Sequence, residues 1–562
     1  MNSPAEPRRV FCLGLDSATF DLVDPWVRAG DLPNLGRLLA EGTRAVLRSV
    51  MLPFSPQAWG TFMTGVNPGR HGIFGFKSKD PNGYAFQFVN NRSVKSRTLW
   101  SLLSELGKKV VVVNIPMTYP PEAVKGILVG GMDAPGIESP FVHPPEFRDT
   151  LLRVAEGYVI HLHIGDGYLD SDAKRRGALK GLFDMTDARE KLVLHLLEHQ
   201  EWDFFVVNFS AIDQVQHHFW QFLGTDHEFR DAIRSVYRRL DDALGRIRAR
   251  LPGDATLLVV SDHGAGPTSP YVFFIDEWLR EQGWLRFQSG RSLRALARSG
   301  LRFASRHLSR RLTSQLKDQL MRIFPKLRVR SQGFIRRSLI DWPATRVYSG
   351  EHPATLRINL KGRDRAGIVE PGGEYEALRD TLIARLQALE HPETGEKLIE
   401  KVYRREEIYH GPWLEEAPDL VLCPPKLAHQ IRGGPFLPGK NYRKIVATKD
   451  GRQFFVSGTH QVEGLFIAWG PEIVRGASVG PLDLVDLFPT ILYGLGLPIP
   501  ASVDGRVALE IFEPGVVARR PPQCADIDLS RDGGAPGAGK STYSDEESRT
   551  IEESLRGMGY IE

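Results

Sequence analysis

The sequence predicts an α/β fold in which helices cover a largely parallel sheet. Apolar runs of strand length occur at residues 9–16, 109–115, 202–209 and 257–260, and stretches with helical periodicity separate them. Strands that are apolar throughout are typical of parallel sheets buried on both faces. Three of these runs also lead into ionisable side chains, and ligands of open α/β sheets gather outside the carboxyl ends of the strands.

The composition is that of a globular protein. The 562 residues are 42% apolar and 25% charged, enough for one large domain with insertions or roughly two to four ordinary domains. The net charge of +4 gives no reason to expect a specific nucleic-acid partner. Cys12, Cys423 and Cys524 lie far apart, which argues against a disulfide framework and favours a reducing compartment. With no signal-peptide core and no run of eighteen apolar residues, we expect a cytoplasmic protein without a membrane span.

The first strand ends at Asp16, and a helix around residues 33–39 and a strand at 43–50 follow it. Ser55 comes next, between Pro53 and Pro56, and a helix with Trp59, Phe62 and Met63 begins there. The position predicts that Ser55 lies at a helix N-terminus, where free N–H groups and the helix dipole favour an anion. The alternative is that Ser55 simply caps the helix.

Helical sequence fills residues 145–200, and the strand at 202–209 precedes Asp213 and His217. These two residues are four apart at the start of a helix, so both project from one face. Such a pair can be a surface contact, or it can present two ligands to one metal.

The strand at 257–260 follows a helix at 226–250 and ends at Ser261-Asp262-His263-Gly264. A carboxylate and an imidazole side by side at a strand end suit a transition metal or a phosphate, and the alternative is a buried structural pair. Further on, the sequence predicts strands at 355–360 and 419–423 and helices at 375–389 and 485–492. His460 lies in a glycine-bounded turn at 458–464, before a strand at 465–469.

Two segments stand apart from this pattern. Residues 286–337 hold fifteen lysines and arginines against one acid, Asp318, with leucines at helical intervals. This basic helical insertion is either a solvated cap, a lid over an anionic substrate or a membrane-surface contact. The tail from residue 513 is rich in Pro, Gly and Ser and then acidic, which predicts flexibility. Its residues 534–541 match the phosphate-loop pattern, but the strand and packed helix that a phosphate loop needs are missing, so a nucleotide-binding ATPase is disfavoured.

Seven side chains therefore gather at the predicted sheet edge: three carboxylates, three imidazoles and one hydroxyl. They are Asp16, Ser55, Asp213, His217, Asp262, His263 and His460. Mixed Asp and His ligands suit Zn²⁺, with Mn²⁺ or Fe as alternatives. Seven groups exceed one tetrahedral site but fit two.

With these residues in place, the chain resembles the alkaline phosphatase superfamily, and within it the type I phosphodiesterase/nucleotide pyrophosphatase branch. The motifs that carry the resemblance are Gly14-Leu15-Asp16, Ser55 with Thr64-Gly65, Pro68…His71-Gly72-Ile73, Asp213-x3-His217, Ser261-Asp262-His263-Gly264, Gly458-Thr459-His460 and Glu463-Gly464. The resemblance implies an alkaline-phosphatase-like sandwich, with a catalytic core at 9–284 and 341–512, the insertion at 285–340 and the tail at 513–562.

By the same resemblance, one divalent metal takes Asp213, His217 and His460. The other takes Asp16, Asp262, His263 and the Ser55 oxygen. Two cations about 4 Å apart can activate a nucleophile and stabilise a leaving oxygen. Ser55 would then attack a small phosphate ester, such as a nucleotide or a lipid headgroup, and form a phosphoserine intermediate.

The candidate nucleophile, Ser55, differs from that of the phosphodiesterase branch, in which threonine is usual. Serine is typical of phosphomonoesterases. The preference for diesters over monoesters is therefore open, and a phosphomonoesterase, phosphonate hydrolase or phospho-headgroup transferase remains an alternative. Sulfatase activity is not expected, because the residues after Ser55 lack the Pro and the Arg at the required offsets. A non-catalytic interaction protein is disfavoured by the full ligand set. Candidate substrate contacts are Asn67, Arg70, Asn114 and Thr118.

Overall fold

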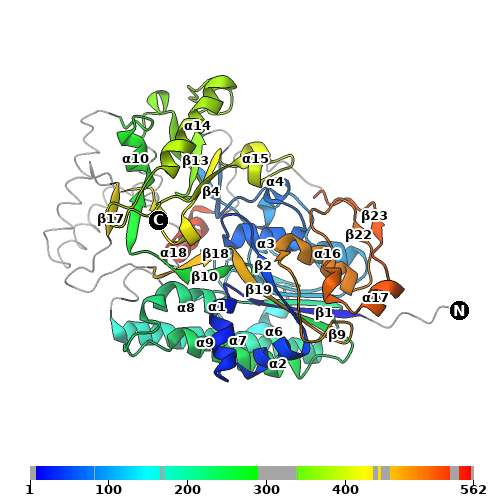
Figure 1. The fold of residues 1–562 in the computed structure, drawn as a ribbon. Coiled ribbons are helices and arrows are strands. Elements are labelled where there is room, and N and C mark those ends of the chain that lie inside the picture. Colours follow the sequence, from blue (N-terminus) through cyan, green and yellow to red (C-terminus); the bar gives the residue numbers. More distant parts are fainter. Residues whose placement is uncertain are drawn as a thin grey trace.

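A twisted ten-stranded sheet forms the centre of the computed structural model (Figure 1). The structure describes residues 8–80, 83–164, 171–288, 339–434, 441–444, 456–531 and 543–557, with Leu169 and Arg337. The strand order is β20-β2-β19-β9-β1-β8-β5-β6-β7, with β21 beside β2. These strands are β1 (Arg9–Leu15), β2 (Thr43–Arg48), β5 (Val110–Ile115), β6 (Gly126–Gly130), β7 (Val142–His143), β8 (Phe204–Phe209), β9 (Ala255–Val260), β19 (Glu463–Trp469), β20 (Ala477–Ser478) and β21 (Leu482–Asp483).

The middle of this sheet is parallel, as the sequence predicts. β9, β1, β8, β5 and β6 run in one direction, whereas β19 and β7 pair antiparallel to their neighbours. Every residue of β5, β8 and β9 is buried, because helices cover both faces of the sheet.

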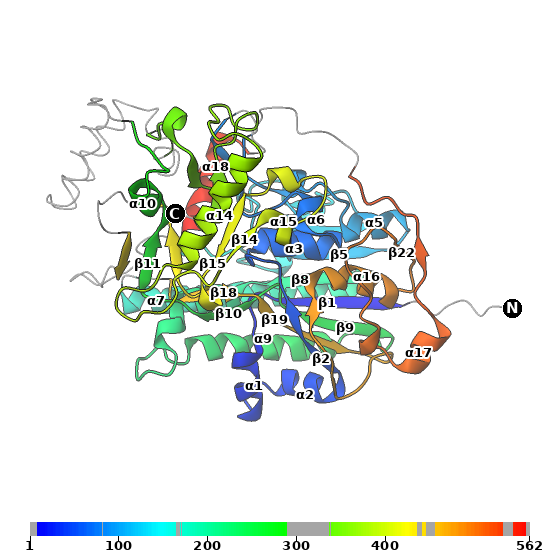
Figure 2. The same cartoon turned by 45° about the horizontal axis from the view of Figure 1, so that its top comes forward.

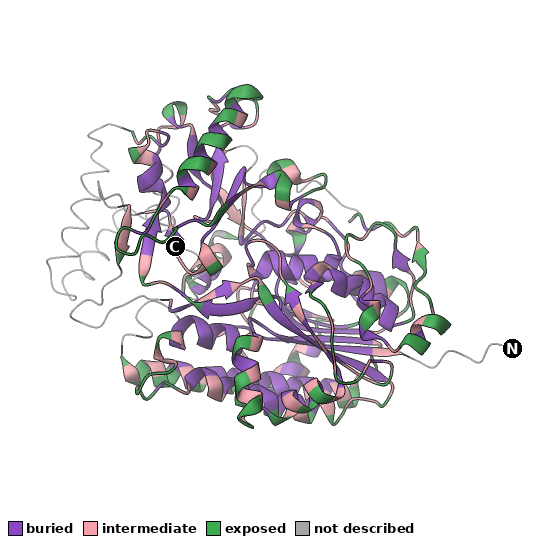
Figure 3. Cartoon of the chain, in the orientation of Figure 1, coloured by how far each residue is buried: buried purple, intermediate pink, exposed green. Residues whose placement is uncertain are grey.

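Each face of the sheet has its own hydrophobic core. Phe11, Leu13 and Leu15 of β1 point into one core, and Val10 and Cys12 point into the other. The first core is covered by α1 (Phe20–Arg28), α2 (Pro33–Glu41), α6 (Phe147–Val154), α7 (Asp172–His199), α8 (Ala211–Phe219) and α9 (Ala232–Arg248). The second is covered by α3 (Ser55–Thr64), α5 (Leu99–Glu105) and α16 (Leu487–Gly494), and α3 is buried along its whole length (Figure 3).

A smaller unit with a third core lies to one side of the central sheet (Figure 2). Its four-stranded sheet has the order β12-β13-β15-β14. The elements are α10 (Ile275–Glu281), β12 (Val347–Ser349), β13 (Thr355–Ile358), α14 (Gly373–Gln387), β14 (Lys401–Arg404), α15 (Arg405–Ile408) and β15 (Leu420–Cys423). Beside it, β11 (Tyr271–Phe274) pairs with β16 (Gln430–Arg432) and β17 (Tyr442–Lys444). The chain returns to the central region through β18 (Gly458–Gln461), which pairs with β10 (Gly264–Pro267).

Asp419 forms a buried ion pair within the smaller unit. Its buried carboxylate accepts hydrogen bonds from both terminal nitrogens of Arg363 at 2.6 and 2.8 Å and from the Tyr375 hydroxyl at 2.7 Å. Burial alone would raise the pKa of Asp419, but the hydrogen bonds and charge of Arg363 outweigh it and lower the pKa to about 2. The pair therefore stabilises the fold fully above the unfolded-state pKa of about 3.9, and this stability is lost as the pH falls through about 2.

We expect Asp419→Asn to lower the free energy of unfolding at pH 7 by about 3 kcal/mol, because both terminal nitrogens of the largely buried Arg363 lose their carboxylate partner and only its Nε keeps one, in Asp364. Urea denaturation measures the difference. The matched control is Asp380→Asn, since the Asp380 side chain is 65% exposed and pairs with Arg404 at the surface. Its effect should stay within about 1 kcal/mol. Equal effects of the two substitutions would contradict this account of the buried pair.

The structure departs from the sequence predictions in three places. The expected turn at 458–464 is a strand, β18, because Gly458 to Gln461 pair with β10. The helical stretch 145–200 is divided into α6 and α7. The tail was expected to be flexible, but its described parts fold onto the core: α17 (Pro514–Arg519), β23 (Cys524–Ala525) beside β22 (Ile499–Pro500), and α18 (Asp545–Gly557) with buried Ile551 and Leu555.

Two of the predicted segments cannot be compared with the structure. Almost all of the basic insertion and the whole of the phosphate-loop match at 534–541 lie outside the described residues. Among the helices that are described, none is both long and apolar enough to cross a membrane.

Candidate metal centre

Three neighbouring parallel strands deliver most of the predicted ligands to one edge of the sheet. β1 leads directly into Asp16, and β9 leads through Ser261 into Asp262 and His263. β8, on the other side of β1, is followed by α8, which carries Asp213 and His217. The carboxyl ends of these strands meet because the strands are parallel and in register, and this is where an open α/β sheet places its ligands.

His460 arrives from a distant part of the chain. It lies opposite Ala265 in the antiparallel pair of β10 and β18, so it stands close to the end of β9. Gly458 permits this approach, since a Cβ atom there would lie 2.3 Å from the carbonyl oxygen of Gln216 on α8. The Ser457 N–H donates to the His217 carbonyl at 2.7 Å, which fixes β18 against α8.

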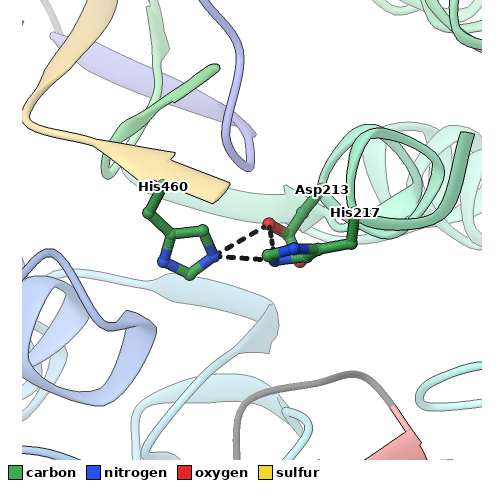
Figure 4. Close-up of side chains that lie close together, drawn as sticks. All are labelled: Asp213, His217 and His460. Atoms are coloured by element: carbon green, nitrogen blue, oxygen red, sulfur yellow. Dashed lines mark hydrogen bonds and ion pairs between the residues drawn. The ribbon is translucent and has the colours of Figure 1, made fainter. Parts of the chain in front are cut away.

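Asp213, His217 and His460 form a compact triangle (Figure 4). The two Nε2 atoms are 2.9 Å apart, and Asp213 Oδ1 is 3.2 Å from His217 Nε2 and 3.3 Å from His460 Nε2. Three ligands of a tetrahedral zinc ion, with bonds of about 2.0 to 2.1 Å, stand roughly 3.3 Å from each other. The spacing of the three atoms therefore fits one metal ion.

The outward nitrogens of the imidazoles decide which ring atoms face this triangle. His217 Nδ1 lies 2.9 Å from the Gly458 carbonyl oxygen, and His460 Nδ1 lies 2.7 Å from that of Pro53. A carbonyl oxygen only accepts, so each Nδ1 carries a proton, and each Nε2 is the ligand atom when its ring is neutral. In the protein alone, burial opposes the protonation of His217, but Asp213 outweighs burial and raises the pKa of His217, so a proton at its Nε2 is favoured where a cation would bind.

A second group lies beside the first and consists of Asp16, Asp262, His263 and Ser55. His263 Nε2 is 3.3 Å from Asp262 Oδ2 and 3.7 Å from Asp16 Oδ1. His263 Nδ1 lies 3.1 Å from the Gly264 carbonyl oxygen, so its Nε2 also carries a lone pair. Asp213 is shared, because its carboxylate, that of Asp16 and the His263 ring offer ligand atoms within 4.8 Å of one another.

Several atoms of this second group have no hydrogen-bond partner of normal geometry within the described residues. They are Asp16 Oδ1, both carboxylate oxygens of Asp262, His263 Nε2 and Ser55 Oγ. All of them are buried, and an unpaired buried polar atom is costly unless something outside the protein binds it. The chemistry of these atoms, oxygens and a lone-pair nitrogen, fits a second divalent cation.

The close packing of buried carboxyl and imidazole groups shifts their pKa values in the protein without a metal. Burial, and then the charge of Asp213, raises the pKa of Asp16 to about 7. Burial, and then the neighbouring Asp16, raises the pKa of Asp262 well above its usual range. Burial followed by His460 lowers the pKa of His263. Asp213 and His217 shift the other way, because their mutual attraction outweighs the effect of burial, and it lowers the pKa of Asp213 and raises that of His217. In the second group, carboxyls that resist ionisation lie beside an imidazole that resists protonation, and a bound cation would relieve both.

Ser55 is fully buried and is the first residue of α3, with Phe54 in the N-cap position. The sequence places it correctly at a helix N-terminus, although Phe54 rather than Ser55 is the capping residue. Pro53, two residues earlier, supplies the carbonyl that orients His460. The segment that carries the hydroxyl is thus hydrogen-bonded directly to one of the metal-binding candidates.

The four candidate substrate contacts have side chains that are already bonded to the protein. Asn67 caps α4 (Pro68–His71), and Arg70 pairs with Asp504 at 2.7 Å. Asn114 donates to the Ile160 carbonyl at 3.0 Å, and Thr118 accepts from the Gly131 N–H at 3.0 Å. The structure therefore gives each of these four side chains a partner within the protein, and their contact with a substrate stays a prediction.

Sequence reasoning missed several polar residues around the centre. Asn208 donates to Asp16 Oδ2 at 2.7 Å and orients that carboxylate. The only available signal was an amide inside an otherwise apolar strand. His161, Gln214 and His218 are also buried near Asp213, and nothing in the sequence could show that His161, 53 residues before Gln214, would meet α8.

A family model described as type I phosphodiesterase/nucleotide pyrophosphatase matches residues 10–435. The chain belongs to this family. No curated protein matches it in sequence. As a member of the type I phosphodiesterase/nucleotide pyrophosphatase family, the protein is a hydrolase of phosphoric esters.

Among solved structures, murine ectonucleotide pyrophosphatase/phosphodiesterase 5 is similar to this family member, with a TM-score of 0.48 and 13% identity over 90% of this chain and 100% of that chain. The same values hold for an inactive threonine-to-alanine variant of the murine protein in complex with AMP. The human protein also gives a TM-score of 0.48 and 13% identity, over 90% of this chain and 98% of that one.

Proposed function

We propose that the protein is a two-metal phosphodiesterase or nucleotide pyrophosphatase that uses Ser55 as its covalent nucleophile. The observation that carries the proposal is a set of buried atoms of Asp16, Asp262, His263 and Ser55 that have no hydrogen-bond partner among the described residues. They lie next to the triangle of Asp213, His217 and His460. Nothing in a purely structural role requires so many buried polar atoms to converge without partners.

The residues divide naturally into two binding groups. Asp213, His217 and His460 would hold one cation, and Asp16, Asp262, His263 and the Ser55 oxygen would hold the other. When bound, two divalent cations lower the pKa of a hydroxyl group, neutralise phosphoryl charge and stabilise a leaving oxygen. Zn²⁺ fits the mixed Asp and His ligands best, with Mn²⁺ or Fe as alternatives.

The protein's own groups then define the order of bond changes. Ser55 Oγ attacks phosphorus, a new O–P bond forms, and the P–O bond to the leaving alcohol or phosphate breaks in line, with the hydroxyl proton passing by way of solvent to the leaving group. A water molecule next attacks the phosphoester on Ser55 and gives its oxygen to phosphorus, and the Ser55 oxygen leaves and takes one proton of that water. The N-terminal end of α3 at Ser55 favours the negative charge of the phosphoryl group.

One observation favours a second candidate function on the same site. Serine rather than threonine is the nucleophile candidate, which is the choice of phosphomonoesterases in the superfamily that the chain resembles. The chemistry of attack is the same in both cases, so the substrates must decide between them.

Parallel assays on bis-p-nitrophenyl phosphate and p-nitrophenyl phosphate test the proposal. We expect the full chain, supplied with Zn²⁺, to hydrolyse the diester with a kcat/KM at least about tenfold higher than that for the monoester, a difference of about 1.4 kcal/mol. The reverse preference would replace the phosphodiesterase by a phosphomonoesterase. Failure to hydrolyse either ester with Zn²⁺, Mn²⁺ or Fe²⁺ would contradict both functions.

We propose that the protein is cytoplasmic, and the state of its cysteines supports this location. Cys12 and Cys423 are buried and unpaired with other cysteines, and Cys524 is an exposed free thiol, as is usual in a reducing compartment.

A further inference from the structure

A second row of polar side chains runs along α8 beside the metal ligands. Gln214 follows Asp213 and His218 follows His217, so the pair Gln214 and His218 is also four residues apart and shares one helix face. The turn of about 100° per residue places this row next to the ligand row. Both side chains are nearly inaccessible, with 1% exposure for Gln214 and 5% for His218.

His161 meets this row from the segment before α7. It is 6% exposed, and its Nδ1 lies 3.2 Å from Gln214 Nε2. The residue before it is held firmly: the Ile160 carbonyl accepts from Arg189 at 2.8 Å and from Asn114 at 3.0 Å. Arg189 also donates to the Asn208 carbonyl at 2.9 Å, which ties the His161 segment to the end of β8. The cluster is thus built on a rigid support.

Three atoms of the cluster remain without a hydrogen-bond partner in the described part of the chain. They are His161 Nε2, Gln214 Oε1 and His218 Nε2, and all are buried. The bond between His161 and Gln214 uses one donor and one acceptor. Whichever way the amide is turned, the remaining atoms of the pair therefore offer one donor and one acceptor. Burial lowers the pKa of His161 to about 3, which keeps this ring neutral.

A group that both donates and accepts is needed to satisfy this pair. A phosphodiester oxygen only accepts, and it would meet repulsion at the acceptor atom. A hydroxyl group donates and accepts at once. Because the phosphoryl oxygens are directed to the cations, a hydroxyl beside them belongs to the organic part of the ester.

We propose that His161, Gln214 and His218 form a subsite that recognises hydroxyl groups and selects phosphoric esters of a sugar or another polyol. The inference rests on the proposed function, because it places this subsite beside the phosphoryl-binding centre. A site built to hydrogen-bond a substrate hydroxyl discriminates strongly against the analogue without it, since its buried polar groups then stay unpaired.

Calorimetric binding of matched phosphates to the full chain with Zn²⁺ tests the subsite. Glycerol 1-phosphate is compared with propyl phosphate, ribose 5-phosphate with tetrahydrofurfuryl phosphate, and inositol 1-phosphate with cyclohexyl phosphate. We expect at least one polyol phosphate to bind at least about tenfold more tightly than its partner. A ratio below tenfold in every pair, as expected if ordered water alone fills the cluster, would overturn the proposal.

The variant Gln214→Leu should abolish that preference and leave the affinity for the hydroxyl-free phosphate unchanged. Gln221→Leu is the matched control, because Gln221 is exposed just beyond α8, and it should keep the preference. A preference that survives in Gln214→Leu would contradict the assignment. The binding of these phosphates can be measured without any turnover, so the test of the subsite does not depend on catalysis. If the protein preferred polyol phosphates but hydrolysed no ester, the proposed function would be refuted and the subsite would still be supported.

The thermal stability of a double variant distinguishes a role in substrate recognition from a purely structural role. The double variant His161→Phe/Gln214→Leu removes two buried atoms without a partner among the described residues, and it removes both partners of the bond between the two side chains, so its melting temperature should be unchanged or higher. A melting temperature lowered by more than about 5 °C would show that the pair serves the fold and would overturn the proposal.

Discussion

Replacing Ser55 by alanine should lower kcat/KM for bis-p-nitrophenyl phosphate by about a thousandfold or more. The substitution removes the attacking oxygen and leaves only direct attack by water, assisted by whatever the remaining groups stabilise. The fold should tolerate the change, because Ser55 Oγ makes no hydrogen bond to a described residue. Initial rates of p-nitrophenol release, measured with equal metal loading, give the ratio directly.

Two further variants, each of a serine, are the controls for this measurement. Ser55→Thr retains a hydroxyl at the same position and should keep activity within about tenfold of the native protein. Ser96→Ala removes another buried hydroxyl, which donates to the Arg70 carbonyl at 3.3 Å, and it should leave the rate unchanged. Native-like activity in Ser55→Ala would refute the covalent mechanism.

The second large effect is expected from Asp213→Asn. Within the described residues, Asp213 is shared by the triangle with His217 and His460 and by the cluster with Asp16 and His263, so the loss of its charge weakens both. We expect metal affinity to fall by at least about a hundredfold, because even residues that merely orient a ligand are worth 10- to 100-fold. After dialysis against a weak chelator, elemental analysis should find less metal in the variant, and ester hydrolysis should fall in parallel.

Asp241→Asn is the matched control for this substitution. Asp241 is as deeply buried as Asp213, at 1% exposure, but its carboxylate accepts from the backbone N–H groups of Asn34 at 2.9 Å and Leu35 at 2.7 Å. The control should lower stability and leave the metal content unchanged. Equal metal content in Asp213→Asn and the native protein would remove Asp213 from the site.

The parallel core and the location of the site could be predicted from sequence because both depend on local patterns. Apolar strands that end in Asp16 or in Asp262 and His263 predict side chains at one sheet edge, and the structure places them there. The four-residue spacing of Asp213 and His217 likewise predicts a shared helix face.

Long-range contacts escaped prediction for a physical reason. His460 lies in a strand whose pairing with β10 spans almost two hundred residues, and its own sequence resembles a turn because glycines bound it. The tail is polar on average, yet Ile551 and Leu555 recur at helical spacing and are buried against the first core. Average composition therefore predicted flexibility where two or three apolar side chains decide the packing.

Anomalous X-ray diffraction at the zinc absorption edge, on crystals of the full chain supplied with Zn²⁺, tests the central claim most directly. The account predicts two peaks, one among Asp213, His217 and His460, and one beside Asp16, Asp262, His263 and Ser55. The absence of a peak at both places, in crystals of a protein that hydrolyses phosphoric esters, would contradict it.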